Sequence, residues 1–63
     1  MPNVLLKLPE VSRRVGLSKT PIYAAVKAGT FPAPVKTGVR SVAWLEAEVD
    51  QWIAERIEAR RAA

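Results

Sequence analysis

The sequence predicts a small, mainly α-helical domain with one β-hairpin, and three observations support this prediction. A stretch bounded by Gly16 and Gly29 has the start and stop signals of a short helix. Two prolines and a Thr-Gly pair interrupt residues 30–38, as expected for a loop followed by a hairpin turn. From Leu45 onward, apolar residues recur with the period of one α-helical face.

Composition excludes several classes of protein. The 63 residues contain no cysteine and no histidine, and the three glycines are isolated, so we expect no disulfide, metal site or Gly-rich phosphate loop. We therefore predict a protein that is not an enzyme and needs no cofactor. No apolar run approaches the roughly 20 residues of a membrane span and no signal-peptide pattern is visible, so we expect one cytoplasmic domain over residues 1–63 with no membrane partner.

Positive charge is concentrated in the first two thirds of the chain. The net charge is +4, yet residues 1–43 hold seven of the ten lysines and arginines and only one of the six acidic residues. This asymmetry favours a polyanion, and nucleic acid above all, as the partner of that part. The simpler alternative is charge that only keeps the surface soluble.

The first helix is predicted at about residues 9–15, after a short edge strand at 4–7. Pro9 suits the first helical position and Gly16 ends the helix. Valines four positions apart share its inward face. We expect three polar side chains to point outward, and the two arginines are candidate phosphate contacts: Glu10, Arg13 and Arg14.

The second helix is predicted at about residues 19–28. Ser18 can cap its N-terminus through the hydroxyl, Pro21 lies in the first turn where its missing N–H costs little, and Gly29 can end it in the left-handed conformation. Two short helices joined by a three-residue turn containing glycine form a helix-turn-helix unit. An αα-hairpin without a ligand fits the spacing equally well.

The second helix also carries the candidate recognition residues: Ser18, Lys19, Thr20, Tyr23 and Lys27. The N-terminal end of such a helix normally meets base edges in the major groove. Tyr23 either donates to a phosphate or packs its ring on the first helix. Because Ala24 and Ala25 offer few groups for reading bases, we predict modest sequence specificity and strong salt dependence.

A hairpin is predicted at about residues 35–43. Gly38 is free to take a positive φ in its turn, and Val42 is the expected inward residue. A basic hairpin beside a helix-turn-helix is a wing, which contacts phosphates or the minor groove. Its candidate contacts are Lys36, Thr37, Gly38 and Arg40. Alternatively, its two cations only keep an edge hairpin soluble.

The C-terminal helix is predicted at about residues 46–60 and is interpreted as a structural brace. Acidic residues occupy its first turns and arginines its last, which matches the helix dipole at both ends. With the other elements it completes the predicted core: Leu6, Leu8, Val11, Val15, Leu17, Ile22, Val26, Phe31, Val35, Val42, Trp44, Leu45, Val49, Trp52, Ile53 and Ile57.

These residues together resemble the AlpA family of prophage regulators and excisionases. The matching segments include Leu8-Pro9-Glu10-Val11, Gly16-Leu17-Ser18-Lys19-Thr20, Phe31-Pro32 and Arg40-Ser41-Val42-Ala43-Trp44. The resemblance implies a MerR-like winged helix-turn-helix. It also implies a regulator of integrase genes, or a recombination directionality factor that bends DNA beside an attachment site. The sequence departs from the family pattern at Pro21, Ala24-Ala25 and Val39.

The leading hypothesis is a DNA-binding excisionase of a prophage or integrative element, acting near attachment sites with a phage-type integrase as partner. An AlpA-like transcriptional regulator without a recombination role is the nearest alternative. A second alternative is a protein-interaction module that docks through the acidic helix or the exposed Leu5 and Val39. Because so small a domain makes few contacts, we expect cooperative, head-to-tail self-association on double-stranded DNA repeats at attachment sites or promoters. We expect it in the nucleoid of a bacterial or phage-infected cell.

Overall fold

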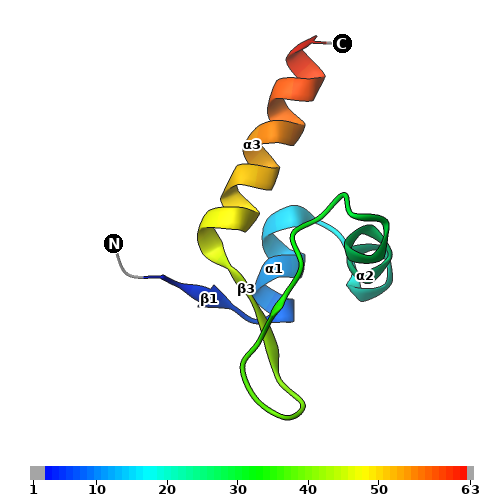
Figure 1. Cartoon of the computed structure of the whole chain (residues 1–63). Helices are drawn as coiled ribbons and strands as arrows, with labels where there is room; N and C mark the ends of the chain where they lie inside the picture. Colours follow the sequence, from blue (N-terminus) through cyan, green and yellow to red (C-terminus); the bar gives the residue numbers. More distant parts are fainter. Residues whose placement is uncertain (1–2, 63) are drawn as a thin grey trace.

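Three helices and a three-stranded antiparallel sheet make up the part of the chain that the computed structural model describes, residues 3–62 (Figure 1). This confirms the mainly α-helical class with a small β-component. In chain order the elements are β1 (Leu5–Leu6), α1 (Leu8–Val15), α2 (Lys19–Ala28), β2 (Val35–Lys36), β3 (Val42–Leu45) and α3 (Glu46–Ala62). None of the helices described is long and apolar enough to cross a membrane.

The sheet has β3 at its centre, in the order β1-β3-β2. Leu6 pairs with Trp44 on one side, and Val35 pairs with Ala43 on the other. The predicted edge strand is therefore confirmed at Leu5–Leu6, and its pairing with β3 turns the predicted hairpin into a three-stranded sheet. Because β3 leads directly into α3, the sheet also sets where α3 starts.

Two strand boundaries differ from the prediction. Within the hairpin predicted at about residues 35–43, the second strand begins only at Val42, because residues 38–40 form the bend at the tip. Leu45, which begins the apolar pattern attributed to the C-terminal helix, is the last residue of β3, and α3 begins at Glu46 as predicted. Leu45 pairs with Leu5, and this pairing holds it extended.

The helix ends follow the predicted signals closely. Gly16 has φ 74° and Gly29 has φ 83°, so both glycines take the left-handed conformation that ends α1 and α2. The bounds of α2 are those predicted. α1 starts one residue early, at Leu8, which places Pro9 at the second helical position; α3 extends to Ala62.

The core contains one or more residues from all three helices and from the sheet. Its buried members are Leu6, Val11, Ile22, Phe31, Ala43, Trp44 and Val49. Ala43 was missed because alanine gives little signal in a hydrophobic pattern. Val35 and Ile57 were predicted as core but are 41% and 42% exposed. Val35 lies on an edge strand, and Ile57 lies on α3 one turn beyond Ile53, the last residue of α3 that packs against the core.

Two tryptophans hold the loop between α2 and β2 in place through hydrogen bonds. The indole N–H of Trp44 donates to the carbonyl oxygen of Pro32 at 2.9 Å, and that of Trp52 donates to the carbonyl oxygen of Thr30 at 2.9 Å. Phe31 is buried, as predicted, with its ring centroid 5.0 Å from that of Trp52. The loop is therefore attached to both β3 and α3, which sets how α2 and the hairpin lie relative to each other.

Candidate nucleic-acid interface

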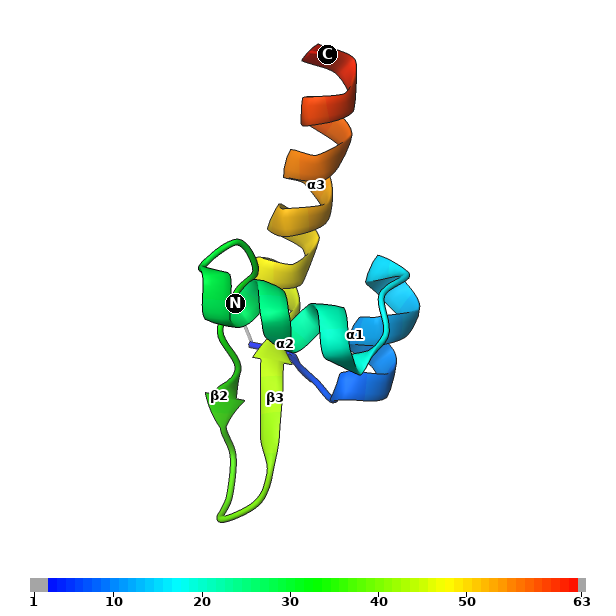
Figure 2. The ribbon, with the colours of Figure 1, turned by 90° about the vertical axis from the view of Figure 1, so that its right-hand side faces the viewer.

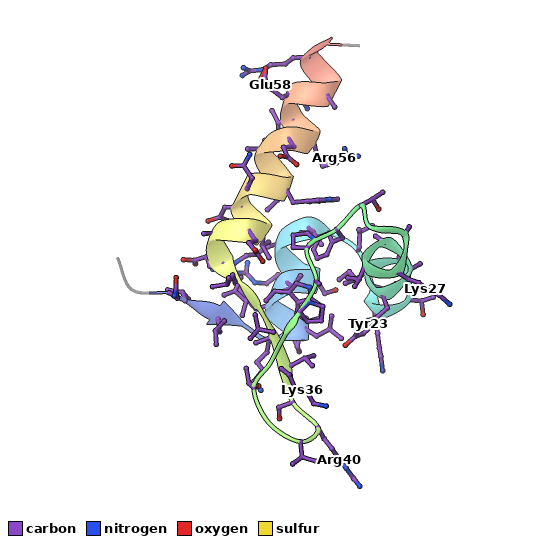
Figure 3. All side chains as sticks on the ribbon, in the orientation of Figure 1. Tyr23, Lys27, Lys36, Arg40, Arg56 and Glu58 are labelled. Atoms are coloured by element: carbon purple, nitrogen blue, oxygen red, sulfur yellow. The ribbon has the colours of Figure 1, made fainter. Side chains whose placement is uncertain are left out.

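One side of the molecule is formed by α2 and the β2–β3 hairpin. Figure 2 looks at this side: α2 lies in front and the hairpin extends below it. In Figure 3 the side chain of Lys27 extends from α2, and those of Lys36 and Arg40 extend from the hairpin, all toward this same side. The fold therefore brings together the cations of two predicted contact regions that are separate in sequence.

The start of α2 differs in one detail from the prediction. Ser18 occupies the N-cap position with extended backbone, φ −80° and ψ 178°, but its hydroxyl makes no capping hydrogen bond. The prediction of a hydroxyl cap is therefore wrong. The serine carbonyl oxygen accepts the first helical bond, from the N–H of Ile22 at 3.2 Å. Ser18, Lys19 and Thr20 are all exposed, so their polar groups face solvent at the helix N-terminus.

Tyr23 lies against the sheet. Its ring centroid is 5.9 Å from that of Trp44, with the planes tilted by 59°, and the residue is 37% exposed. The sequence suggested α1 as the surface beneath this ring, but its aromatic neighbour is Trp44 of β3. Part of the side chain stays open to solvent, and its contact with a phosphate remains a prediction.

The hairpin tip is closed by two backbone hydrogen bonds. The N–H groups of Thr37 and Gly38 donate to the carbonyl oxygen of Ser41 at 2.9 and 3.3 Å. Gly38 does not take a positive φ, so that expectation is wrong and the turn does not require glycine for its backbone angle. Residues 35–40 are all exposed, and Val39 reaches 90%.

Val39 was not among the predicted DNA contacts. The signal that identifies it is an apolar residue between Gly38 and Arg40, at the position where a hairpin turn normally carries a polar one.

The arginines of α1 behave differently from the cations of α2 and the hairpin. Arg14 was expected to point outward, which is wrong: its Nε donates to Glu10 at 2.8 Å and its Nη1 donates to Glu46 of α3 at 3.0 Å. Arg13 is exposed as expected but is also paired with Glu10. Contact of either arginine with phosphate remains a prediction.

Glu10 neutralises part of the charge on α1. Hydrogen bonds from Arg13, and then from Arg14, lower the pKa of the Glu10 carboxyl from 4.5 to about 2. The carboxylate is therefore ionised at neutral pH and offsets the positive field of its two partners.

By contrast, four exposed cations on α2 and the hairpin form no ion pair within residues 3–62: Lys19, Lys27, Lys36 and Arg40. Four of the seven cations without an ion pair in the described residues therefore belong to α2 and the hairpin, and the other three are Lys7, Arg56 and Arg60.

The paired helices α1 and α2, with a β-hairpin beside them, define a winged helix-turn-helix. The chain belongs to the family of the prophage CP4-57 regulatory protein (AlpA), whose family model matches residues 4–57.

Two relatives support this assignment. The chain is 45% identical over 56 residues to an uncharacterized protein, ORF88, of Enterobacteria phage P4, a match that covers 89% of this chain and 64% of the phage protein. It is 36% identical over 58 residues to the DNA-binding transcriptional activator AlpA of Escherichia coli strain K12, covering 82% of this chain and 83% of the relative. The chain thus spans less than two thirds of the length of the phage relative.

Proposed function

We propose that this chain is a DNA-binding regulator and that residues 1–63 act as one winged helix-turn-helix domain on double-stranded DNA. The observation that carries the proposal is the set of four exposed cations on α2 and the hairpin that form no ion pair within residues 3–62. The name of the E. coli relative, a DNA-binding transcriptional activator, supports the same conclusion.

α2 enters the major groove by its N-terminal end. Ser18, Lys19 and Thr20 lie there, exposed, at the helix terminus whose free N–H groups and dipole favour phosphate. Ala24 is small and exposed, which allows a close approach of the helix but adds no group that distinguishes bases. Specificity is therefore modest, and phosphate contacts supply most of the affinity.

The hairpin acts as the wing. Lys36, Thr37, Gly38 and Arg40 follow the DNA backbone beside the groove that α2 occupies. Their exposure and the absence of ion pairs at the two cations, within the described residues, support this role.

In the cell, the domain acts as an excisionase that promotes integrase-mediated excision of a prophage or integrative element, and it also regulates transcription. A regulator of transcription with no recombination role fits about as well, because the E. coli relative is named as a transcriptional activator. Either role places the protein at DNA in the cytoplasm. Several copies bind adjacent repeats cooperatively, head to tail, since one small domain offers few contacts.

An open groove of about 310 Å³ between α1 and α3 supports a protein partner, which in the excisionase hypothesis is the integrase. Its lining residues are Arg14, Val15, Trp52, Ile53, Arg56, Ile57 and Arg60. Arg56 lies over the Trp52 ring, 5.6 Å from its centroid, and Figure 3 shows it on the side of α3 opposite Glu58. An apolar floor edged by guanidinium groups fits an acidic segment with an apolar anchor.

DNA binding is tested by gel shifts on the DNA that flanks the gene, located first by footprinting. Lys19→Glu and Arg40→Glu each place a negative charge in the proposed interface, so both variants should lose binding while circular dichroism shows an intact fold. Arg61→Glu makes the same change of charge at the far end of α3 and should still bind. If all three variants lose DNA binding equally, binding depends on the net charge of the protein and not on this interface.

The two roles are separated by an excision assay and a promoter reporter on the same DNA. A chain that activates the reporter but has no effect on integrase-driven excision is a regulator only. The partner groove is tested with Arg56→Glu combined with Arg60→Glu, which should keep the gel shift and lose excision. If this double variant supports full excision, the integrase does not use the groove.

A further inference from the structure

The tip of the hairpin carries an apolar side chain that almost nothing covers. Val39 is 90% exposed, whereas the other exposed large hydrophobic residues of the described chain are between 37% and 46% exposed and so are half covered by neighbours. Such exposure of a valine keeps its whole isopropyl group in contact with water, which is unfavourable in the free protein. The side chain contributes nothing to the core, so it is free to contact a partner.

The surroundings of Val39 indicate what it meets. It lies between Gly38 and Arg40, in a tip held closed by the two hydrogen bonds to the Ser41 carbonyl. Lys36 and Arg40 are exposed and form no ion pair within residues 3–62. The hairpin extends beyond α2, below that helix in the view of Figure 2. A single apolar group flanked by cations therefore projects from the molecule at its proposed interface.

We propose that Val39 inserts between two neighbouring base pairs from the minor groove, partly unstacks them and bends the duplex. Apolar wedges act in this way in proteins that bind the minor groove. Lys36 and Arg40 contact phosphates beside the inserted side chain, and their attraction offsets the cost of unstacking. The inference rests on the proposed function, because it presupposes that the hairpin lies on DNA.

A protein partner explains Val39 less well. Apolar groups that bind proteins form contiguous patches of several hundred Å², and charged residues are depleted at the centres of such interfaces. Val39 is one side chain, and Arg40 follows it directly. Insertion also predicts which sequence lies beneath the tip: a pyrimidine–purine step such as TA or CA, because these steps unstack most easily.

The test uses a duplex that carries one footprinted repeat, with 2-aminopurine placed at the base step beneath the hairpin. Unstacking of this base raises its fluorescence. The wild-type chain at saturation should raise it, and so should Val39→Ile, which keeps an apolar side chain. Val39→Ser should bind about tenfold more weakly, the loss expected when one valine side chain is not buried, and should give no rise at saturation.

The salt dependence of DNA affinity distinguishes insertion of Val39 from the contacts of charged side chains with phosphates. Val39→Ser should leave the slope of log affinity against log salt unchanged, whereas Arg40→Ala should reduce its magnitude by about one. Equal fluorescence for wild type and Val39→Ser, both bound at saturation, would overturn the insertion and leave DNA binding intact. If the wild-type chain binds no DNA under any salt condition, the proposed function fails instead, and insertion fails with it.

Discussion

Trp44 donates the indole N–H of its fully buried side chain to the carbonyl oxygen of Pro32 at 2.9 Å. Trp44 belongs to β3, and Pro32 belongs to the loop that leaves α2. The ring of Trp44 is also 5.9 Å from that of Tyr23 on α2. This single side chain therefore connects the helix proposed to enter the major groove with the hairpin proposed to contact the minor groove.

Replacing Trp44 should destabilise the fold more than replacing the other tryptophan. Trp44→Phe leaves the partly buried carbonyl oxygen of Pro32 without its donor and opens a space in the core, so we expect a loss of about 3 kcal/mol in the free energy of unfolding. Trp52→Phe removes a more exposed hydrogen bond and should cost about 1 kcal/mol. Urea denaturation measures both values. Equal losses of stability in the two variants would show that the Trp44–Pro32 hydrogen bond stabilises the fold no more than the Trp52–Thr30 hydrogen bond.

The ion pair between α1 and α3 should contribute to stability. Arg14 is 28% exposed in its side chain and reaches Glu46 of α3, whereas Arg13 is 72% exposed and reaches only Glu10. Arg14→Met should therefore lower the free energy of unfolding measurably, and the matched change Arg13→Met should lower it less. Thermal melts of the two variants test this difference. If Arg13→Met lowers stability as much as Arg14→Met does, the ion pair between α1 and α3 makes no special contribution.

Acidic pH should lower the free energy of unfolding, because Glu10 becomes protonated. Hydrogen bonds from the two arginines lower the pKa of the Glu10 carboxyl from 4.5 to about 2. The contribution of Glu10 to stability is therefore complete at pH values above 4.5 and is lost as the pH falls through about 2. Glu10→Gln should be less stable than the wild type at neutral pH, and the difference should shrink steadily in acid. Denaturation at a series of pH values measures it. Glu48→Gln, a change at a carboxyl with no ion pair in residues 3–62, is the control.

The glycine that ends α2 should not tolerate a side chain, although nothing crowds it. Gly29 has φ 83° with open space where a Cβ would lie, so Gly29→Ala should cost about 1 kcal/mol through backbone strain alone. Gly38→Ala is the matched control: φ is not positive there, and its Cβ would meet Ser41 at an ordinary 3.6 Å. It should change the melting temperature little. A large loss in this control would mean that the tip needs glycine for another reason.

The hydroxyl of Tyr23 should matter for DNA rather than for folding. Tyr23→Phe keeps the ring that lies against Trp44, so the melting temperature should stay the same. Loss of a hydrogen bond to phosphate should weaken DNA binding about fivefold. Melting curves and gel shifts on the same preparation measure the two effects. Unchanged affinity would assign Tyr23 to packing alone.

The sequence by itself determined the three helices and most of their ends. The positive φ values at Gly16 and Gly29 and the exact bounds of α2 follow from local chemistry, because caps and breakers act on the residues next to them. Most of the predicted core is confirmed for the same reason, since periodic apolar residues identify one face of each helix. The predicted contact residues of α2 and the hairpin are exposed, and their contact with DNA remains a prediction.

Only the tertiary structure decided how these elements meet. The pairing of Leu5 with Leu45, the aromatic neighbour of Tyr23 and the ion pair from Arg14 to Glu46 all join residues that are far apart in the chain. Local periodicity carries no information about such contacts, because each depends on which faces the completed core brings together. The same packing places an uncovered Val39 at the end of the hairpin, beside the cations that the sequence had already identified.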